Sequence, residues 1–221
     1  MDSSRDPAIS SNADVGAEFE GTETANSAYR TAVPALPRWA RLAGTVGWMA
    51  PILGFVPLHI PWILGIPFLA HKASFDSWYN GRSNGTEGFP DGIMGVPAGA
   101  VYLGILVLLA ILGGVLSLGL ISPWGLVFPR WVPWLAGHRV PPWFPLTPTV
   151  IGSGIMVAYS LTLPIQLPRA IADASPDDPF TLTGALIGLP ILLAWTVALP
   201  AAGWSYYRRT RRASWRRSTS T

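Results

Sequence analysis

His59 is the residue with the strongest claim to chemistry, because it lies within a long apolar stretch and is flanked by Pro57 and Pro61. An ionisable side chain in a membrane span is a functional candidate by default, and proline-broken helices often form ligand or ion sites in transporters. Because histidine titrates near neutral pH, His59 could carry a proton. The alternative is structural: a neutral imidazole would hydrogen-bond a carbonyl freed by Pro57 or Pro61 and fix a kink. The structural interpretation is the favoured one.

A second polar group lies in the segment that follows, Ala70 to Gly92. Its ionisable members are His71, Lys72, Asp76, Arg82, Glu87 and Asp91. Their spacing matches no metal-binding or hydrolase motif, and a solvated loop explains them better. The chain has no cysteine, and no carboxylate lies in an apolar stretch. We therefore predict no catalytic residue, no metal site and no cofactor.

The third group is a run of arginines near the C-terminus. Its members are Arg208, Arg209, Arg211, Arg212, Arg216 and Arg217. Next to a membrane span such a cluster attracts anionic lipid headgroups, at about 1 kcal/mol per charge near the surface. Nucleic-acid binding and phosphorylation of Ser214 are the alternatives. We expect the arginines to contact lipid headgroups and expect no nucleic-acid partner.

The elements that must position these residues are membrane spans, since half of the chain is hydrophobic and only 12% is charged. A span needs about 20 mainly apolar residues, and the run within 95–121 exceeds this without a single charge. The hydropathy pattern predicts an all-α polytopic protein with four transmembrane helices, at about 41–70, 95–121, 146–167 and 182–206. The four prolines of the first span predict a kinked or broken helix.

Residues 1–38 are polar and acidic, which predicts a disordered tail, and residues 208–221 form a basic tail after the four-helix domain of residues 39–207. Lys and Arg are concentrated before the first span, between the second and third, and after the fourth. The other two loops hold Lys72, Arg82 and Arg169. By the positive-inside bias both termini are predicted to be cytoplasmic, in the plasma membrane.

Two glycine pairs with four-residue spacing, Gly95/Gly99 and Gly184/Gly188, would allow close approach of helix backbones. Chance matches are common in a chain this rich in glycine. The pairs predict close packing, and they do not by themselves predict a dimer.

The run from Trp124 to Trp143 (WGLVFPRWVPWLAGHRVPPW) and the stretch from Leu58 to Phe68 (LHIPWILGIPF) resemble parts of uncharacterised four-helix integral membrane proteins of actinobacteria. The resemblance covers roughly residues 40–207 and implies the same topology, with no functional residue to carry over. The function expected is that of a non-enzymatic scaffold or partner subunit, with a protein partner or a homo-oligomer as its assembly. A small transporter or channel built around His59 is the alternative, and a membrane enzyme is the least favoured.

Overall fold

The computed structural model describes residues 33–81, 95–129, 132, 134–172 and 178–218, together with Thr24 and Ser27. Within these residues the chain is helical and contains no strand. Four helical stretches are long and apolar enough to cross a membrane, namely Arg38–Ile63, Ala98–Ile121, Trp143–Ile165 and Leu182–Arg212. The all-α class with four transmembrane helices is therefore confirmed.

The first span is a composite helix made of α2 (Arg38–Met49), the π-helical turn η1 (Ala50–Phe55) and α3 (Val56–Ile63). It ends at Ile63 and not at Ala70 as predicted from hydropathy. Gly65, with a φ of 75°, turns the chain there. The apolar residues beyond this turn lie outside the helix, because hydropathy alone does not register a backbone reversal.

Residues 70–92 were predicted to be a solvated loop, and for their first part this is wrong. Lys72–Tyr79 form helix α4, on which Phe75 and Trp78 are buried. The two aromatic residues are three positions apart and so share one helical face, which packs against Trp62 and Leu103. Only the polar face of α4 is left to solvent. Most of the remaining loop lies outside the described residues.

The second span is α5 (Ala98–Ile121), followed by the short helix η2 (Pro123–Gly125). The chain then forms a loop closed by an isolated antiparallel bridge between Val127 and Arg139. Its Trp134 is 96% exposed, as expected for a ring at the membrane–water interface. The third and fourth spans lie in α6 (Trp143–Ala172) and α7 (Leu182–Ser218).

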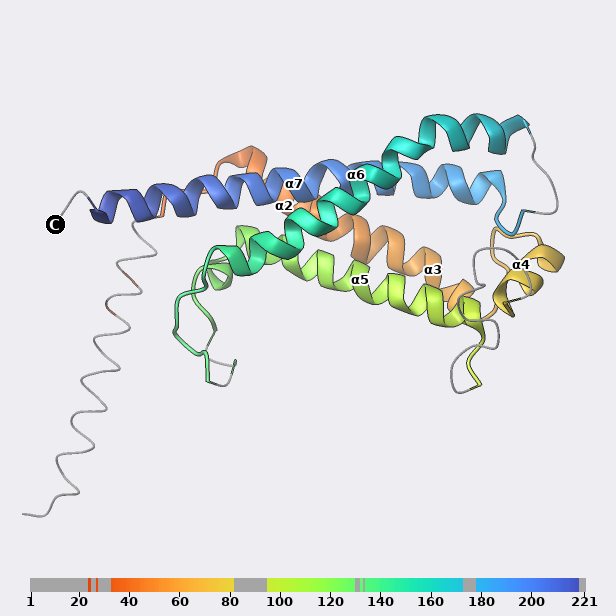
Figure 1. The fold of residues 1–221 in the computed structure, drawn as a ribbon, viewed down its shortest axis with the longest axis horizontal. Helices are drawn as coiled ribbons and strands as arrows, with labels where there is room; N and C mark the ends of the chain where they lie inside the picture. Colours follow the sequence, from red (N-terminus) through yellow and green to blue (C-terminus); the bar gives the residue numbers. More distant parts are fainter. Residues whose placement is uncertain are drawn as a thin grey trace, which may run out of the picture.

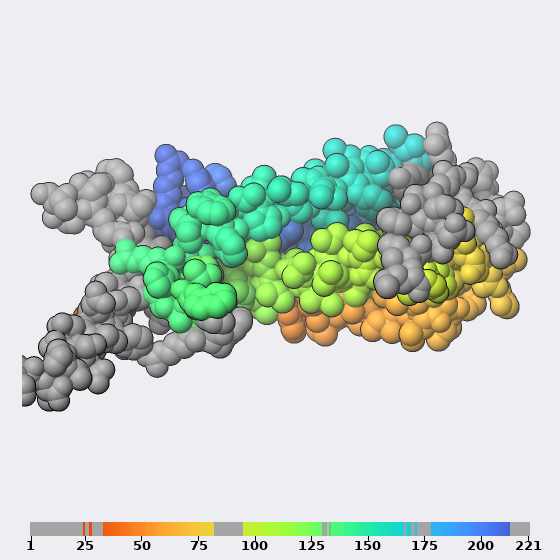
Figure 2. Space-filling model, turned by 60° about the horizontal axis from the view of Figure 1, so that its bottom comes forward, coloured from red at the N-terminus to blue at the C-terminus, as the bar shows by residue number. Residues whose placement is uncertain are grey.

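The arrangement is a core of three helical stretches with a fourth helix on its outside. α2–α3 packs on both α5 and α7, whereas α6 packs mainly on α7. Figure 2 shows α5 lying between α6 and the α2–α3 stretch. In Figure 1, the start of α2, the end of α5, the start of α6 and the end of α7 lie at one end of the bundle, and α4 lies at the other.

Glycines of the first span set the close packing of this core. A Cβ added at Gly47 would lie 2.9 Å from Oγ of Ser117 and 3.7 Å from Cβ of Ala198, so α5 and α7 both approach the same backbone. A Cβ at Gly54 would lie 2.8 Å from Ile191. Small residues permit such approach in lipid, where packing between helices replaces the hydrophobic drive.

The glycine pairs singled out in the sequence do not hold the spans together. Gly95 has a φ of 82° and open space where its Cβ would be, and Gly99 contacts the backbone and ring of Tyr79. Gly184 faces Leu69, and a Cβ at Gly188 would lie 3.9 Å from Leu58. Close packing is present, but it uses other glycines.

The described parts of the two tail segments are packed or helical. Val33, within the segment predicted to be disordered, is buried in a cluster with Leu120, Val127 and Tyr206. At the other end α7 continues to Ser218, so the basic segment is a helical extension of the fourth span. Most of residues 1–32 and residues 219–221 lie outside the described part of the chain.

Candidate site at the pi-helical turn

The π-helical turn in the first span follows from its prolines. Pro51 cannot donate to Gly47, and Pro57 cannot donate to Leu53, so the four-residue hydrogen-bond ladder is interrupted on both sides of the turn. The N–H of Val56 bonds instead to the carbonyl of Pro51, five residues back. π-helical turns are rare and occur frequently at functional sites. This turn therefore marks the first candidate region of the protein.

His59 lies one turn beyond the π-helical segment and is partly buried. Its Nδ1 lies 2.7 Å from the carbonyl oxygen of Phe55. A carbonyl only accepts, so Nδ1 carries the proton and donates it. The imidazole stacks on the Phe55 ring at 3.7 Å and 22°, and Trp62 meets it edge-on at 4.9 Å. The ring is thus fixed by one hydrogen bond and two aromatic contacts.

The structural interpretation of His59 predicted a bond of this kind but a different acceptor. Pro61 deprives the carbonyl of Pro57 of its usual donor, and Pro57 deprives that of Leu53. The carbonyl that His59 bonds belongs to Phe55, whose usual backbone donor is the N–H of His59 itself. The imidazole therefore reinforces the start of α3 and does not replace a donor removed by proline.

An aromatic cluster adjoins His59 through Trp62 and joins α3 and α4 to Phe180, which precedes α7. Trp62 of α3 lies 4.4 Å from Phe180, and Trp78 of α4 lies 5.3 Å from the same ring. The indole N–H of Trp62 donates to the carbonyl of Phe68. The hydroxyl of Tyr79 donates to the carbonyl of Ile63 at 2.9 Å, and burial raises the pKa of this hydroxyl. The cluster closes the end of the bundle nearest His59.

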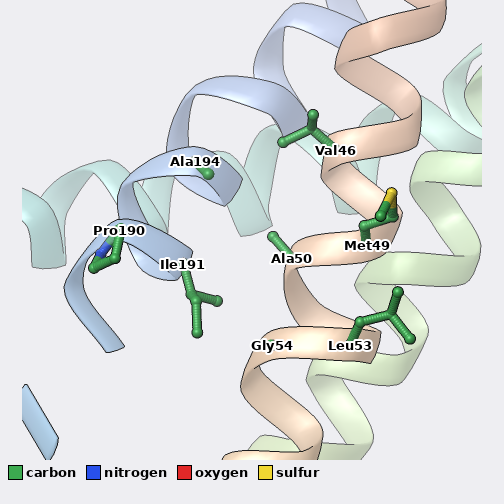
Figure 3. A pocket seen from close by; sticks show the side chains of 8 residues that line it. All are labelled: Val46, Met49, Ala50, Leu53, Gly54, Pro190, Ile191 and Ala194. Carbon is green, nitrogen blue, oxygen red and sulfur yellow. The ribbon is translucent and has the colours of Figure 1, made fainter. Parts of the chain in front are cut away.

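A shallow apolar groove of about 430 Å³ lies beside the π-helical turn, between the first span and α7. Figure 3 shows its lining residues, which are Val46, Met49, Ala50, Leu53, Gly54, Pro190, Ile191 and Ala194. The small residues Ala50, Gly54 and Ala194 leave the space between the two helices. None of the lining residues is charged, so the groove suits an apolar chain and offers no group for catalysis.

The arginines of the C-terminal cluster divide into two kinds. Arg208, Arg211 and Arg212 are exposed, and Nη1 of Arg211 donates to the hydroxyl of Tyr207 at 3.0 Å. Arg209 is different, because its side chain is half-buried and its Nη2 donates to the carbonyl of Leu120 at 2.6 Å. A positive charge on the last carbonyls of α5 is favourable for that helix. Arg209 is thus less available for a lipid headgroup than the exposed arginines are.

Next to Arg209, Tyr206 is almost fully buried, and its hydroxyl donates to the carbonyl of Gly125 at 2.9 Å. The two residues attach α7 to the end of α5 and to η2. Sequence reasoning missed this role because both side chains lie in a run typical of a membrane boundary. Arg216 and Arg217 lie in the last turns of α7, and their side chains are outside the described part of the structure.

The polar group after the first span does not form a site where it is described. The Nδ1 of His71 bonds the carbonyl of Asp178, and Lys72 pairs with Asp76 at 3.0 Å on the same helix. Within the described residues no group of His, Asp or Glu is suited to hold a metal ion. The predicted members Arg82, Glu87 and Asp91 lie outside the described residues.

The chain matches no family model, no curated protein and no solved structure. The candidate site is therefore interpreted from its own residues.

Proposed function

We propose that the chain is a non-enzymatic integral membrane protein that acts as a scaffold or partner subunit. The observation that carries the proposal is the environment of His59. The one ionisable side chain of the first apolar stretch has its ring bonded to the backbone of its own helix and enclosed by Phe55 and Trp62. Such a fixed imidazole suits a structural role better than a proton relay.

The packing of α6 supports the same proposal. This helix contacts mainly α7, and large apolar residues such as Val150, Ile151, Ile155 and Leu161 are exposed on it. A Cβ added at Gly154 would meet open space, so another helix could approach this backbone closely. We propose that this side of α6 is where a membrane partner or a second copy docks.

A small transporter or channel is the second candidate, and one observation favours it. His59 follows a π-helical turn in the middle of a span, and such turns frequently accompany function. Nε2 of His59 is the ring nitrogen that does not bond Phe55 and could accept a proton. Four helices would have to open, or to assemble with further copies, to form a path to it.

The proposed location is the plasma membrane with both termini in the cytoplasm. The start of α2 and the end of α7, which carry Arg38 and the arginine cluster, lie at the same end of the bundle (Figure 1). The positive-inside bias supports the cytoplasmic side for that end.

The experiment that separates the two functions uses the absence of cysteine. A single cysteine is placed at residue 59, with Leu58→Cys and Ile60→Cys as controls within the span and Ala73→Cys on α4 as an exposed control. A water-soluble maleimide is then applied to membranes. The scaffold proposal expects labelling at residue 73 alone. Labelling at 59 but not at 58 or 60 would show that water reaches the His59 site within the span and would favour transport.

The partner surface is tested separately with a photoreactive amino acid in place of Ile155 on α6. The matched control is Leu108 on α5, which is exposed to a similar degree. The proposal expects a crosslinked product of one defined mass from position 155 and none from position 108. Products of equal yield from both positions would overturn the assignment of α6.

A further inference from the structure

The apolar groove beside the π-helical turn continues toward the basic end of the bundle along one face of each helix. On α2, Trp39 and Val46 are seven residues apart, and on α7 Ala194, Ala201 and Arg208 have the same spacing. Residues seven apart lie on nearly the same face of a helix. Val46, Leu53 and Ala194 line the groove, so Trp39 and Arg208 lie on its extension.

The two helix faces cover the same range along the bundle axis. The contacts of Gly54 with Ile191 and of Gly47 with Ala198 show that α2–η1 and α7 run antiparallel in one register. One step of seven residues further, that register brings Ala40 beside Ser205, and both are buried. Trp39 and Arg208 then differ in height by about 3 Å, at a rise of 1.5 Å per residue.

We call the surface where α2–η1 and α7 meet, from the groove to Trp39 and Arg208, the α2–α7 seam. Charged side chains lie at its Arg208 end and are absent from the groove. Arg208 and Arg212, one helical turn apart on the same face of α7, are both exposed. Trp39 is 48% exposed on the α2 side, and an indole there suits the headgroup level. The seam thus combines two cations and an interfacial ring at one end with the shallow apolar groove at the other.

The distance between these two ends matches one lipid leaflet. From Arg208 to Ala194 the helix rises about 21 Å, at 1.5 Å per residue. Half of a hydrocarbon core is about 15 Å, and a headgroup layer adds about 5 to 7 Å. We propose that the α2–α7 seam binds one anionic glycerophospholipid, with its phosphate at Arg208 and Arg212 and the end of an acyl chain in the groove.

The test uses the full chain in nanodiscs with phospholipids that carry a photoreactive group near the end of an acyl chain. One probe has a phosphatidylglycerol headgroup and the other a phosphatidylcholine headgroup. The expected result is preferential crosslinking of the anionic probe to residues 46–54 and 190–194. Equal crosslinking of the two probes there would overturn the proposal, as would a crosslink to a second copy of the chain.

Charge variants test the headgroup site. Arg208→Gln with Arg212→Gln is expected to lower the preference for the anionic probe by more than the roughly thirtyfold that two charges near the surface supply by general attraction. The matched control, Arg41→Gln with Arg211→Gln, removes the same charge at the same end of the bundle but off the seam. If both double variants lost the preference for the anionic probe equally, the preference would come from general electrostatic attraction, and the specific site would be overturned.

Groove variants test the position of the acyl chain. Ala194→Phe fills the groove and is expected to abolish crosslinking to residues 46–54. Leu108→Phe adds a similar ring on α5, at a position that is 57% exposed and outside the groove, and should leave the crosslinks in place. Unchanged crosslinking in Ala194→Phe would overturn the assignment. The charge variants lie on the surface and test the site even where the groove variant does not fold.

Discussion

Two glycines of α5 differ in what surrounds them, and their replacement tests whether glycine contacts hold the core together. A Cβ added at Gly113 would lie 2.7 Å from Cζ2 of Trp195, which is almost fully buried. A Cβ added at Gly104 would meet nothing within 4 Å. Both glycines lie inside the same helix, so replacement by alanine has the same intrinsic effect on helix stability at both positions.

The expected free energies follow from two opposing effects. Alanine in place of glycine stabilises a helix interior by about 0.5 to 1 kcal/mol. Overpacking a close contact costs about 1 to 3 kcal/mol. We therefore expect Gly104→Ala to stabilise the protein and Gly113→Ala to be neutral or destabilising. The two variants should differ by about 1 to 3 kcal/mol in their free energy of unfolding, because only one has the second effect.

The measurement is unfolding in mixed micelles with increasing dodecyl sulfate, followed by the far-ultraviolet circular dichroism of the helices. A third variant, Trp195→Phe, removes the ring atom that the added Cβ would meet. In that background the cost of Gly113→Ala should fall, since residues in contact are energetically coupled. Equal shifts for Gly104→Ala and Gly113→Ala would refute the reasoning, and so would an unchanged cost in the Trp195→Phe background.

Three further predictions concern single hydrogen bonds, each followed by the same unfolding measurement. Tyr206→Phe leaves the carbonyl of Gly125 without its donor and should lower the free energy of unfolding by about 1 to 3 kcal/mol; an unchanged value would contradict the contact. Arg209→Gln removes the charge and the bond at the carbonyl of Leu120, and should cost about 1 to 2 kcal/mol. Loss of stability only at low ionic strength would point to a lipid role for Arg209 instead. Burial raises the pKa of Tyr79, so the folded protein keeps this proton when the unfolded chain has lost it, and stability should fall as pH rises above about 10. Tyr79→Phe should weaken that fall, and an identical pH profile would contradict it.

The sequence predicted the number of membrane spans because spans are defined by length and hydropathy alone. The run of residues 95–121 was placed to within a turn of α5, and the kinked first span was expected from its prolines. The form of the irregularity, a π-helical turn at Ala50–Phe55, was not predictable. It depends on which carbonyls find donors when proline removes one, and that depends on neighbouring turns and helices.

The remaining differences arise from contacts between segments far apart in the sequence. α4 forms because Phe75 and Trp78 pack against Trp62 and Leu103. The polar composition of the segment does not indicate that it has a buried apolar face. Arg209 points inward because α5 ends beside it, a fact that no property of the arginine run indicates. A hydrogen bond from His59 to a backbone carbonyl of its own helix was predicted. Which carbonyl accepts it, that of Phe55, depends on the local backbone conformation.

The peripheral position of α6 connects the packing with the proposed function. Its attachment to α7 uses the fit of Thr149 against Gly203, where a Cβ would lie 2.6 Å from Cγ2, and one hydroxyl pair, Ser160 with Thr196 at 3.1 Å. These contacts lie on one side of the helix, and lipid hydrocarbon is as apolar as the side chains on its other side. The exposed face of α6 therefore costs nothing in a bilayer, and we propose that a partner docks there. The proposed scaffold would use the three-stretch core for rigidity and the exposed face of α6 as the surface that exchanges lipid for protein.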